Sequence, residues 1–135
     1  MAGAPEGPRD GGRRARGREA EDLAAAFLEA RGYRVLARNH RLRRGEVDLV
    51  CEQGAVVCFV EVRSRTGDAH GAPEETVDRR KARRVVLAAE DWAARNAVAG
   101  RDLRFDVVAV TFGEGAPRLA HFPAAFDAAG LPGIW

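Results

Sequence analysis

The chain has 135 residues, of which 46% are hydrophobic, and its net charge is +2. This length predicts one domain with a real hydrophobic core and is too short for two ordinary domains. No apolar run is long enough to span a membrane, and the N-terminus lacks the apolar segment of a signal peptide, so we expect a cytoplasmic protein without membrane contacts. Cys51 and Cys58 are expected to be reduced residues of apolar strands, because no zinc-binding pattern accompanies them.

Basic residues are unevenly distributed along the chain. Residues 1–16 are rich in Gly, Pro and Arg and predict a disordered tail, ahead of one domain over 17–126 and a short C-terminal tail over 127–135. Two more basic clusters lie at 31–44 and 79–84. Such clusters could follow a phosphate backbone. Since arginine supplies all but one of the 22 basic residues, they could equally reflect a biased genome composition.

The first predicted helix covers residues 19–30 and ends before Gly32. Leu23 and Phe27 belong to its apolar stripe, while Glu21 lies at the edge of the face that should meet a sheet. That position could direct the Glu21 carboxylate toward a site on the sheet. On helix rules alone, an acidic first turn that favours the helix dipole is the preferred explanation of Glu21.

The next segments predict strands and a hairpin that carries two acidic residues. A strand over 33–38 is followed by two apolar runs, which a tight turn at Gln53-Gly54 would join into an antiparallel hairpin. With that turn, Asp48 lies opposite Phe59 and diagonal to Glu61. Two carboxylates so placed could share a hard cation such as magnesium. The alternative is a solvated strand face on which Glu61 forms a salt bridge with Arg63.

The second half of the chain predicts a loop over 64–73, a long helix over 74–96 and strands over 104–110 and 118–122. Lys81 falls on the apolar face of the long helix, where it could reach the two carboxylates or extend to solvent. Asp106 could support the site, but pairing with Arg104 is the expected role. His40 and His121 have no acidic or cysteine partner at ligand spacing, so we assign neither a catalytic role.

Several motifs together closely resemble the YraN-like family of small bacterial proteins, over about residues 17–126. They are residues 21–28, Gly32-Tyr33, Arg38-Asn39, Gly45-Glu46-Val47-Asp48-Leu49-Val50, residues 59–65, Lys81 and residues 104–108. That family is similar in turn to the PD-(D/E)xK nucleases, particularly archaeal Holliday junction resolvases. The resemblance implies an α/β protein with a restriction-endonuclease-like core, in which two main helices flank a mixed central sheet of four to five strands.

The resemblance also implies a role for each candidate site residue. Asp48 and Glu61 would bind Mg²⁺ or Mn²⁺, with the Val62 carbonyl as a further ligand and Glu21 completing the site. Arg63 occupies the position of the superfamily lysine, and Lys81 matches a lysine of the YraN-like family. The positions that would contact the flanking nucleic-acid backbone are Arg41, Arg43, Arg44 and Arg65.

Two positions depart from the superfamily pattern. Val47 replaces the proline before Asp48, which changes little. Arg63 replaces a lysine, and a guanidinium cannot accept a proton. Arg63 could therefore hold a phosphate, while a water activated by the metal, or a deprotonated Lys81, would have to supply the base.

The sequence thus predicts a metal-dependent nucleic-acid phosphodiesterase, with branched or structured DNA as the expected partner. The alternative is a non-catalytic nucleic-acid-binding or adaptor domain that keeps the nuclease scaffold. A homodimer is a further expectation, because resolvase-like proteins often dimerise on symmetric junctions. The sequence leaves the choice between enzyme and adaptor open.

Overall fold

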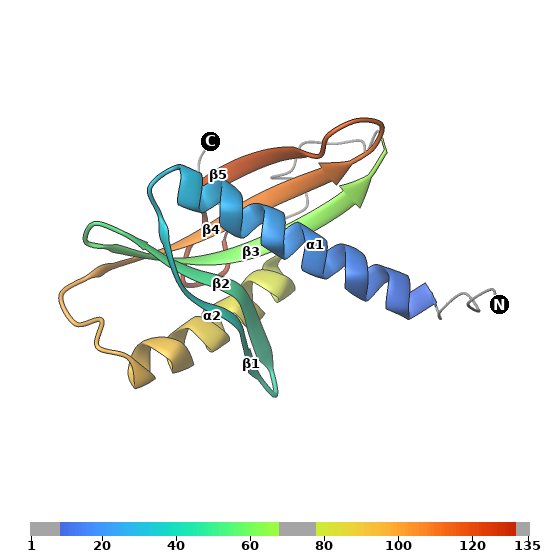
Figure 1. The fold of residues 1–135 in the computed structure, drawn as a ribbon. Coiled ribbons are helices and arrows are strands. Elements are labelled where there is room, and N and C mark those ends of the chain that lie inside the picture. Colours follow the sequence, from blue (N-terminus) through green and yellow to red (C-terminus); the bar gives the residue numbers. More distant parts are fainter. Residues whose placement is uncertain (1–8, 68–77, 132–135) are drawn as a thin grey trace.

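The computed structural model describes the backbone of residues 9–67 and 78–131, and side chains from Arg14 onward within these ranges. Two helices and five strands follow one another along the chain (Figure 1). In chain order they are α1 (Arg9–Ala30), β1 (Arg34–Leu42), β2 (Gly45–Gln53), β3 (Val56–Thr66), α2 (Arg79–Arg95), β4 (Asp102–Phe112) and β5 (Arg118–Phe126).

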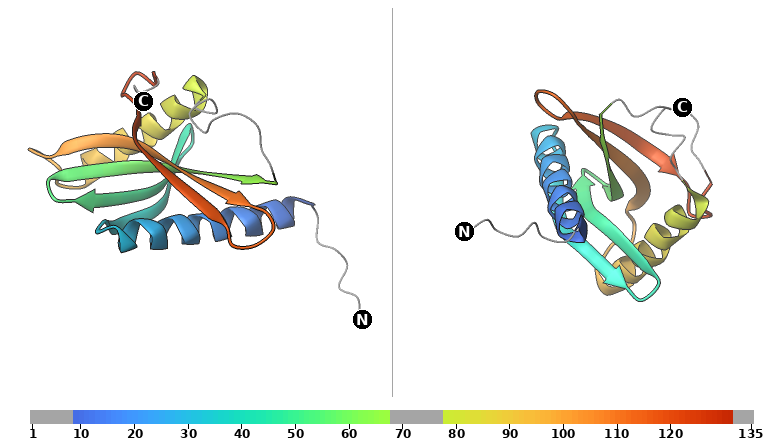
Figure 2. Two further views of the ribbon diagram at one scale, coloured as in Figure 1. Left: turned by 90° about the horizontal axis from the view of Figure 1, so that it is seen from above. Right: turned by 90° about the vertical axis from the view of Figure 1, so that its right-hand side faces the viewer.

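The five strands form one mixed sheet in the order β1-β2-β3-β4-β5. Neighbouring strands are antiparallel except β3 and β4, which are parallel and are connected through α2. Helix α1 covers one face of the sheet and α2 covers the other (Figure 2). The predicted α/β class, with a mixed central sheet between two main helices, is confirmed and is consistent with a restriction-endonuclease-like core.

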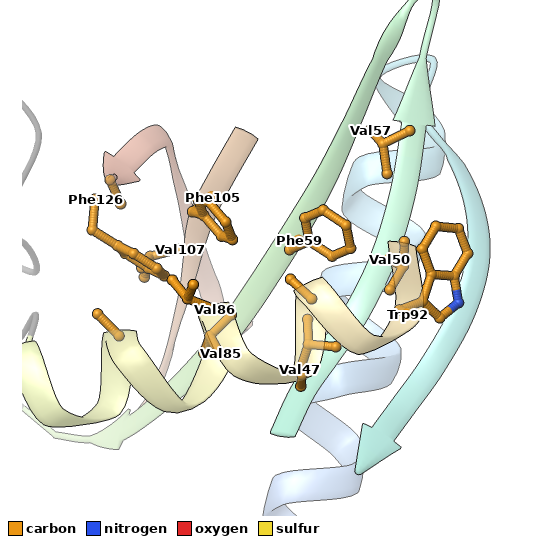
Figure 3. Close-up of a cluster of buried hydrophobic side chains, with 14 residues drawn as sticks. Val47, Val50, Val57, Phe59, Val85, Val86, Trp92, Phe105, Val107 and Phe126 are labelled. Carbon is orange, nitrogen blue, oxygen red and sulfur yellow. The ribbon is translucent and has the colours of Figure 1, made fainter. Parts of the chain in front are cut away.

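Each helix buries a different set of side chains against the sheet. Small residues of α1, including Ala20 and Ala24, pack on Cys51 and Cys58 of β2 and β3. On the other face, α2 covers a larger aromatic cluster, in which Phe59 lies 5.9 Å from the Trp92 ring (Figure 3). The two helices together bury the centres of β2 and β3, whereas the end of β3 from Glu61 onward is half-buried or exposed.

The hairpin register differs from the prediction. Gln53 pairs with Val56, so the turn residues are Gly54-Ala55, and Val50 rather than Asp48 lies opposite Phe59. Gly54 has a φ of 59°, a conformation that glycine adopts without steric cost, and this places it first in the turn. The last backbone pair toward Asp48 is Leu49 with Val60.

Helix α1 begins at Arg9 rather than at Glu19, so residues 9–16 are helical and not part of a disordered tail. The five arginines of residues 9–18 favour helix, but the three glycines of the same segment disfavour it, so local propensity does not explain this extension of α1. The guanidinium carbon of Arg16 also lies 4.5 Å from the centre of the Phe112 ring, which ties this part of α1 to β4.

The other predicted boundaries shift as well. The described part of α2 starts after Asp78, whose side chain accepts a hydrogen bond from the Arg80 N–H and caps the helix. The predicted helix residues 74–77 and most of the predicted 64–73 loop lie outside the described residues. Strand β5 continues to Phe126. Residues 127–131 form a turn in which the Asp127 side chain accepts hydrogen bonds from the Ala129 and Leu131 N–H groups.

No helix in the described chain is long and apolar enough to cross a bilayer.

Candidate functional site

An open pocket with a volume of about 640 Å³ lies between β2, β3 and the start of α2. It brings together Asp48, Glu61, Arg63 and Lys81, four of the residues that the sequence predicts for the site. Its complete lining is Glu46, Asp48, Glu61, Val62, Arg63, Ser64, Asp78, Arg80, Lys81, Arg84 and Val85. The pocket therefore combines carboxylates and cations within one concavity.

Asp48 is held at the end of the β2–β3 ladder by its side chain. Its Oδ2 accepts a hydrogen bond of 2.7 Å from the Val62 N–H, beyond the last backbone pair of the two strands. Burial raises the pKa of Asp48 to about 7, and the Val62 hydrogen bond opposes this rise. The negative charges of Glu21, Glu46 and Glu61 raise the pKa further. A carboxylate in these surroundings is stabilised by any cation that approaches it.

Glu61 and Arg63 form an ion pair on β3, with Arg63 Nε 2.8 Å from Glu61 Oε2. Their side chains are only 14% and 17% exposed, so water screens this pair weakly. Burial raises the pKa of Glu61, while the charges of Arg63 and Lys81 lower it. Arg63 Nε is buried and has no partner with hydrogen-bond geometry among the described residues. The contact is therefore mainly electrostatic. A salt bridge between these two residues, the alternative considered from the sequence, is present.

Glu21 and Lys81 relate to the pocket in different ways. Lys81 lines it and is exposed, although Val85, Ala88 and Trp92 of the same predicted stripe are buried. Glu21 is half-buried on α1 and does not line the pocket, but its charge raises the pKa of Asp48. The structure thus places Glu21 within electrostatic range of the pocket without making it part of the wall.

The pocket offers two carboxylates to a metal ion rather than a complete protein cage. Among the described residues, no group of three or more His, Cys, Asp or Glu side chains is arranged to hold a metal. Oδ1 of Asp48 accepts no hydrogen bond from a described residue, and Glu61 lies in the same pocket. Magnesium commonly binds one or two carboxylates and completes its coordination with water and substrate phosphate. The donor set fits Mg²⁺ or Mn²⁺ bound in that manner.

The arginines predicted to contact nucleic acid are not equivalent. Arg41 donates a 2.8 Å hydrogen bond to Glu46, so part of its charge is already compensated. Arg43 and Arg44 are exposed where β1 turns into β2, and neither forms an ion pair within the described chain. Arg65 lies on β3, two residues after Arg63, and is half-buried.

Sequence reasoning missed Glu46, Asp78, Arg80 and Arg84 as pocket residues. Within the basic cluster at 79–84, the sequence assigns only Lys81 to the site and none of the arginines. Helical spacing could have indicated the two arginines, because residues three and four positions apart share a helix face. Arg84 is three residues from Lys81, and Arg80 is four residues from Arg84.

A second polar cluster is built on Asp106, the one buried charged residue of the described chain. Its carboxylate accepts hydrogen bonds of 2.9 and 2.8 Å from Arg104 and one of 3.0 Å from the Ala124 N–H. His121 Nε2 lies 2.8 Å from Oδ2. Burial opposes ionisation, but the bonds from His121, Arg104 and Ala124 lower the pKa of Asp106. Asp106 does not line the pocket, and its expected pairing with Arg104 is confirmed.

Both histidines that looked isolated in the sequence have an acidic partner. His121 contacts Asp106, and His40 Nε2 lies 2.8 Å from Asp91 Oδ2. The partners are 15 and 51 residues away in the chain, so only strand pairing and helix packing bring them together. Spacing along the chain therefore did not reveal either partner, and neither histidine lines the pocket.

Comparison with known proteins places this pocket in a family context. Residues 20–110 match the description "Uncharacterised protein family UPF0102", and this range contains every residue that lines the pocket. The chain belongs to the UPF0102 family. The family match confirms the predicted resemblance to YraN-like proteins, whereas kinship with the PD-(D/E)xK nucleases stays a prediction.

Bacterial UPF0102 proteins are similar to this chain over most of their length. One from Anaeromyxobacter sp. strain Fw109-5 is 65% identical over 125 residues, which cover 93% of this chain and 94% of the relative. One from Anaeromyxobacter dehalogenans is 63% identical over 135 residues and covers both chains completely. A more distant UPF0102 protein from Geobacter sulfurreducens is 43% identical over 110 residues, or 81% of this chain and 86% of the relative.

Proposed function

We propose that this UPF0102 chain is a metal-dependent nucleic-acid phosphodiesterase. The observation that carries the proposal is the shared pocket of Asp48 and Glu61, two carboxylates with raised pKa, beside Arg63, Lys81 and further basic side chains. Perturbed carboxylates in a concave site are typical of catalytic centres. Their combination with cations suits a reaction in which a metal and a phosphate must be held together.

The pocket residues divide into two roles. Asp48 and Glu61 would hold Mg²⁺ or Mn²⁺, with the Val62 carbonyl as a further donor, and the ion would neutralise phosphate charge and increase the acidity of a water. Glu21 would act on Asp48 through its charge. Arg63 and Lys81 would bind the scissile phosphate and stabilise the charge that develops on it. Arg63 stays protonated, so it positions the phosphate and accepts no proton.

Branched or otherwise structured DNA is the proposed substrate class. This choice rests on the resemblance to resolvases and on exposed basic residues that lead away from the pocket, among them Arg43 and Arg44. Phosphate contacts of this kind position a nucleic acid without reading its sequence. We therefore expect selection by shape rather than by base sequence.

A non-catalytic nucleic-acid-binding domain is the second candidate, and the Glu61–Arg63 ion pair favours it. Arg63 neutralises one of the two carboxylates while both side chains are largely buried. If that pair persists when nucleic acid binds, the pocket keeps a phosphate-binding surface and loses its affinity for a metal. This candidate predicts salt-dependent binding that needs no divalent ion and produces no cleavage.

The deciding experiment is a cleavage screen over single-stranded, duplex, flap and four-way DNA and matching RNAs, with Mg²⁺ or Mn²⁺. Wild type is compared with Asp48→Asn and Glu61→Gln, after circular dichroism has shown that the variants fold. Loss of cleavage in both variants is the expected result. Wild-type cleavage by the folded variants would exclude this pocket as the active site.

A matched control guards against a contaminating nuclease. Glu52 lies on β2 outside the pocket and pairs with Arg34 and Arg101. Glu52→Gln removes one strand carboxylate without touching the pocket, so its cleavage should equal that of wild type. If wild type binds nucleic acid but cleaves none of the substrates in the presence of a divalent metal, the result would select the non-catalytic candidate.

A further inference from the structure

Helix α2 carries two pairs of arginines that face different surroundings. Arg80 and Arg84 line the pocket. Arg79 and Arg83 lie instead against the turn at Gly130, where a Cβ on the glycine would come within 3.0 Å of Arg83 Cγ and 3.5 Å of Arg79 Cγ. The helix therefore presents a pocket-side pair and a turn-side pair of identical charge and spacing.

The pocket-side pair has no acidic partner within the described chain. Some exposed arginines are compensated, for example Arg34 by Glu52 and Arg38 by Asp22. Arg79 and Arg83 also form no ion pair with a described residue, so it is the place in the pocket wall that distinguishes the pocket-side pair. Arg80 and Arg84 are exposed and form no ion pair with a described residue. Asp78 is close in sequence, but its Oδ1 accepts the Arg80 backbone N–H as the helix cap. Like charges four residues apart disfavour a helix, so this arrangement gains stability when an anion binds between them.

Tight packing continues the basic surface from α2 onto the sheet. Gly45 lies directly against the backbone of Arg84, and a Cβ there would also come within 3.2 Å of the Ala88 nitrogen. Arg43 and Arg44 immediately precede Gly45 and are exposed. The turn between β1 and β2 therefore meets α2 next to Arg84, so its two arginines extend the same charged surface.

We infer that Arg80 and Arg84 bind consecutive phosphates of the nucleic-acid strand whose scissile phosphate enters the pocket. Residues four positions apart are separated by about 6 Å along a helix axis, a spacing that long arginine side chains can match to neighbouring phosphates. The strand then continues toward Arg43 and Arg44. The choice of ligand rests on the proposed function, but the binding itself requires neither metal nor cleavage.

The two arginine pairs supply their own matched test. Binding of a fluorescein-labelled DNA of about 20 nucleotides, single-stranded and duplex, is measured by fluorescence anisotropy in EDTA at roughly 50 to 200 mM salt. The variants are Arg80→Gln/Arg84→Gln and Arg79→Gln/Arg83→Gln, which remove equal charge from one helix. We expect the pocket-side variant to bind about tenfold more weakly, and the turn-side variant within about twofold of wild type.

Salt dependence adds a second readout. Loss of two phosphate contacts should reduce the slope of log affinity against log salt by about 1.4 on single strands and about 1.8 on duplex. The inference would be overturned if the two variants lost affinity equally or if neither lost affinity. It would also be overturned if wild type did not bind nucleic acid. Thermal unfolding of both variants checks that neither effect comes from misfolding.

Cleavage measured in parallel separates this inference from the proposed function. Metal-dependent cleavage by wild type, with unchanged binding by the pocket-side variant, would refute the arginine assignment and leave the enzyme proposal standing. Absence of cleavage, with selective loss of binding in the pocket-side variant, would support the assignment and favour the non-catalytic candidate.

Discussion

The amide N–H of Val62 donates a hydrogen bond of 2.7 Å to Oδ2 of Asp48, just beyond the last backbone pair of β2 and β3, Leu49 with Val60. At the edge of the pocket, the Asp48 side chain therefore accepts the strand-to-strand hydrogen bond in place of a backbone carbonyl. The bond fixes one carboxylate oxygen, while burial keeps the pKa of Asp48 high. This position makes Asp48 sensitive both to pH and to cations.

Asp48 should make stability depend on pH. Its folded-state pKa of about 7 lies above the usual 3.8, so between these values the folded protein binds more protons than the unfolded chain. The free energy of unfolding therefore decreases as pH rises through this range. Asp48→Asn cannot ionise and should be more stable than wild type above pH 7, by up to about 4 kcal/mol. Urea unfolding on both sides of the transition tests this, and a pH dependence unchanged by the substitution would contradict it.

Divalent ions should bind most strongly when Asp48 is ionised. Because protons compete for the same carboxylate, we expect Mn²⁺ affinity to increase from about pH 6 to about pH 8. Isothermal titration measures this directly, and the added ion should also raise the melting temperature. Asp48→Asn and Glu61→Gln should lose the binding heat, while Glu52→Gln should keep it. Undiminished binding in the two pocket variants would place the metal elsewhere.

Gly45 should be intolerant of a side chain. A Cβ at this position would clash with the Arg84 carbonyl oxygen, so Gly45→Ala must push α2 away from β2. We expect a loss of about 1–3 kcal/mol in urea unfolding and weaker metal binding in the pocket between these elements. Gly17→Ala is the control, since a Cβ there meets nothing within 4 Å. That change should stabilise α1 by about 0.5–1 kcal/mol. Equal effects of the two substitutions would refute the packing argument.

Asp106 should be essential for stability rather than for activity. Asp106→Asn removes the charge that compensates Arg104 within a buried cluster, so we expect a loss of about 3 kcal/mol near neutral pH. Because its pKa is lowered in the folded state, the contribution of Asp106 should disappear as pH falls below the usual 3.8. Chemical unfolding across pH measures both effects. Asp102→Asn, an exposed change on the same strand, should cost less than about 0.5 kcal/mol.

Much of the fold follows from local sequence patterns. Apolar runs around Gly54 predict the β2–β3 hairpin, and the apolar stripe of α2 predicts its buried face. The exact register does not follow, because Gln53-Gly54 and Gly54-Ala55 are both acceptable turns. The two registers differ by two residues, so Val50 and Phe59 lie on the face toward α2 in both, and burial of that face does not distinguish them. The structure has Gly54, with a φ of 59°, as the first turn residue.

Local sequence patterns predict least well which residues the charged side chains pair with. Arg104 pairs with a residue two positions away and is predicted correctly, whereas His121 needs the irregular pairing of β4 and β5 to reach Asp106. Ala124, with a φ of 54°, belongs to the same irregular segment and donates its N–H to Asp106. A buried carboxylate stabilises this conformation, and no local propensity encodes it.

The sequence by itself determined the α/β class, the family, and two of the four acidic residues of the pocket, Asp48 and Glu61, because these depend on periodicity and on short motifs. Only the tertiary structure decided which cations surround them. Arg80 and Arg84 face the pocket, while Arg79 and Arg83 lie against the turn at Gly130. Four arginines within six residues look alike in a sequence. Their roles separate only when α2 packs against Gly45 at a rotation set by the buried core.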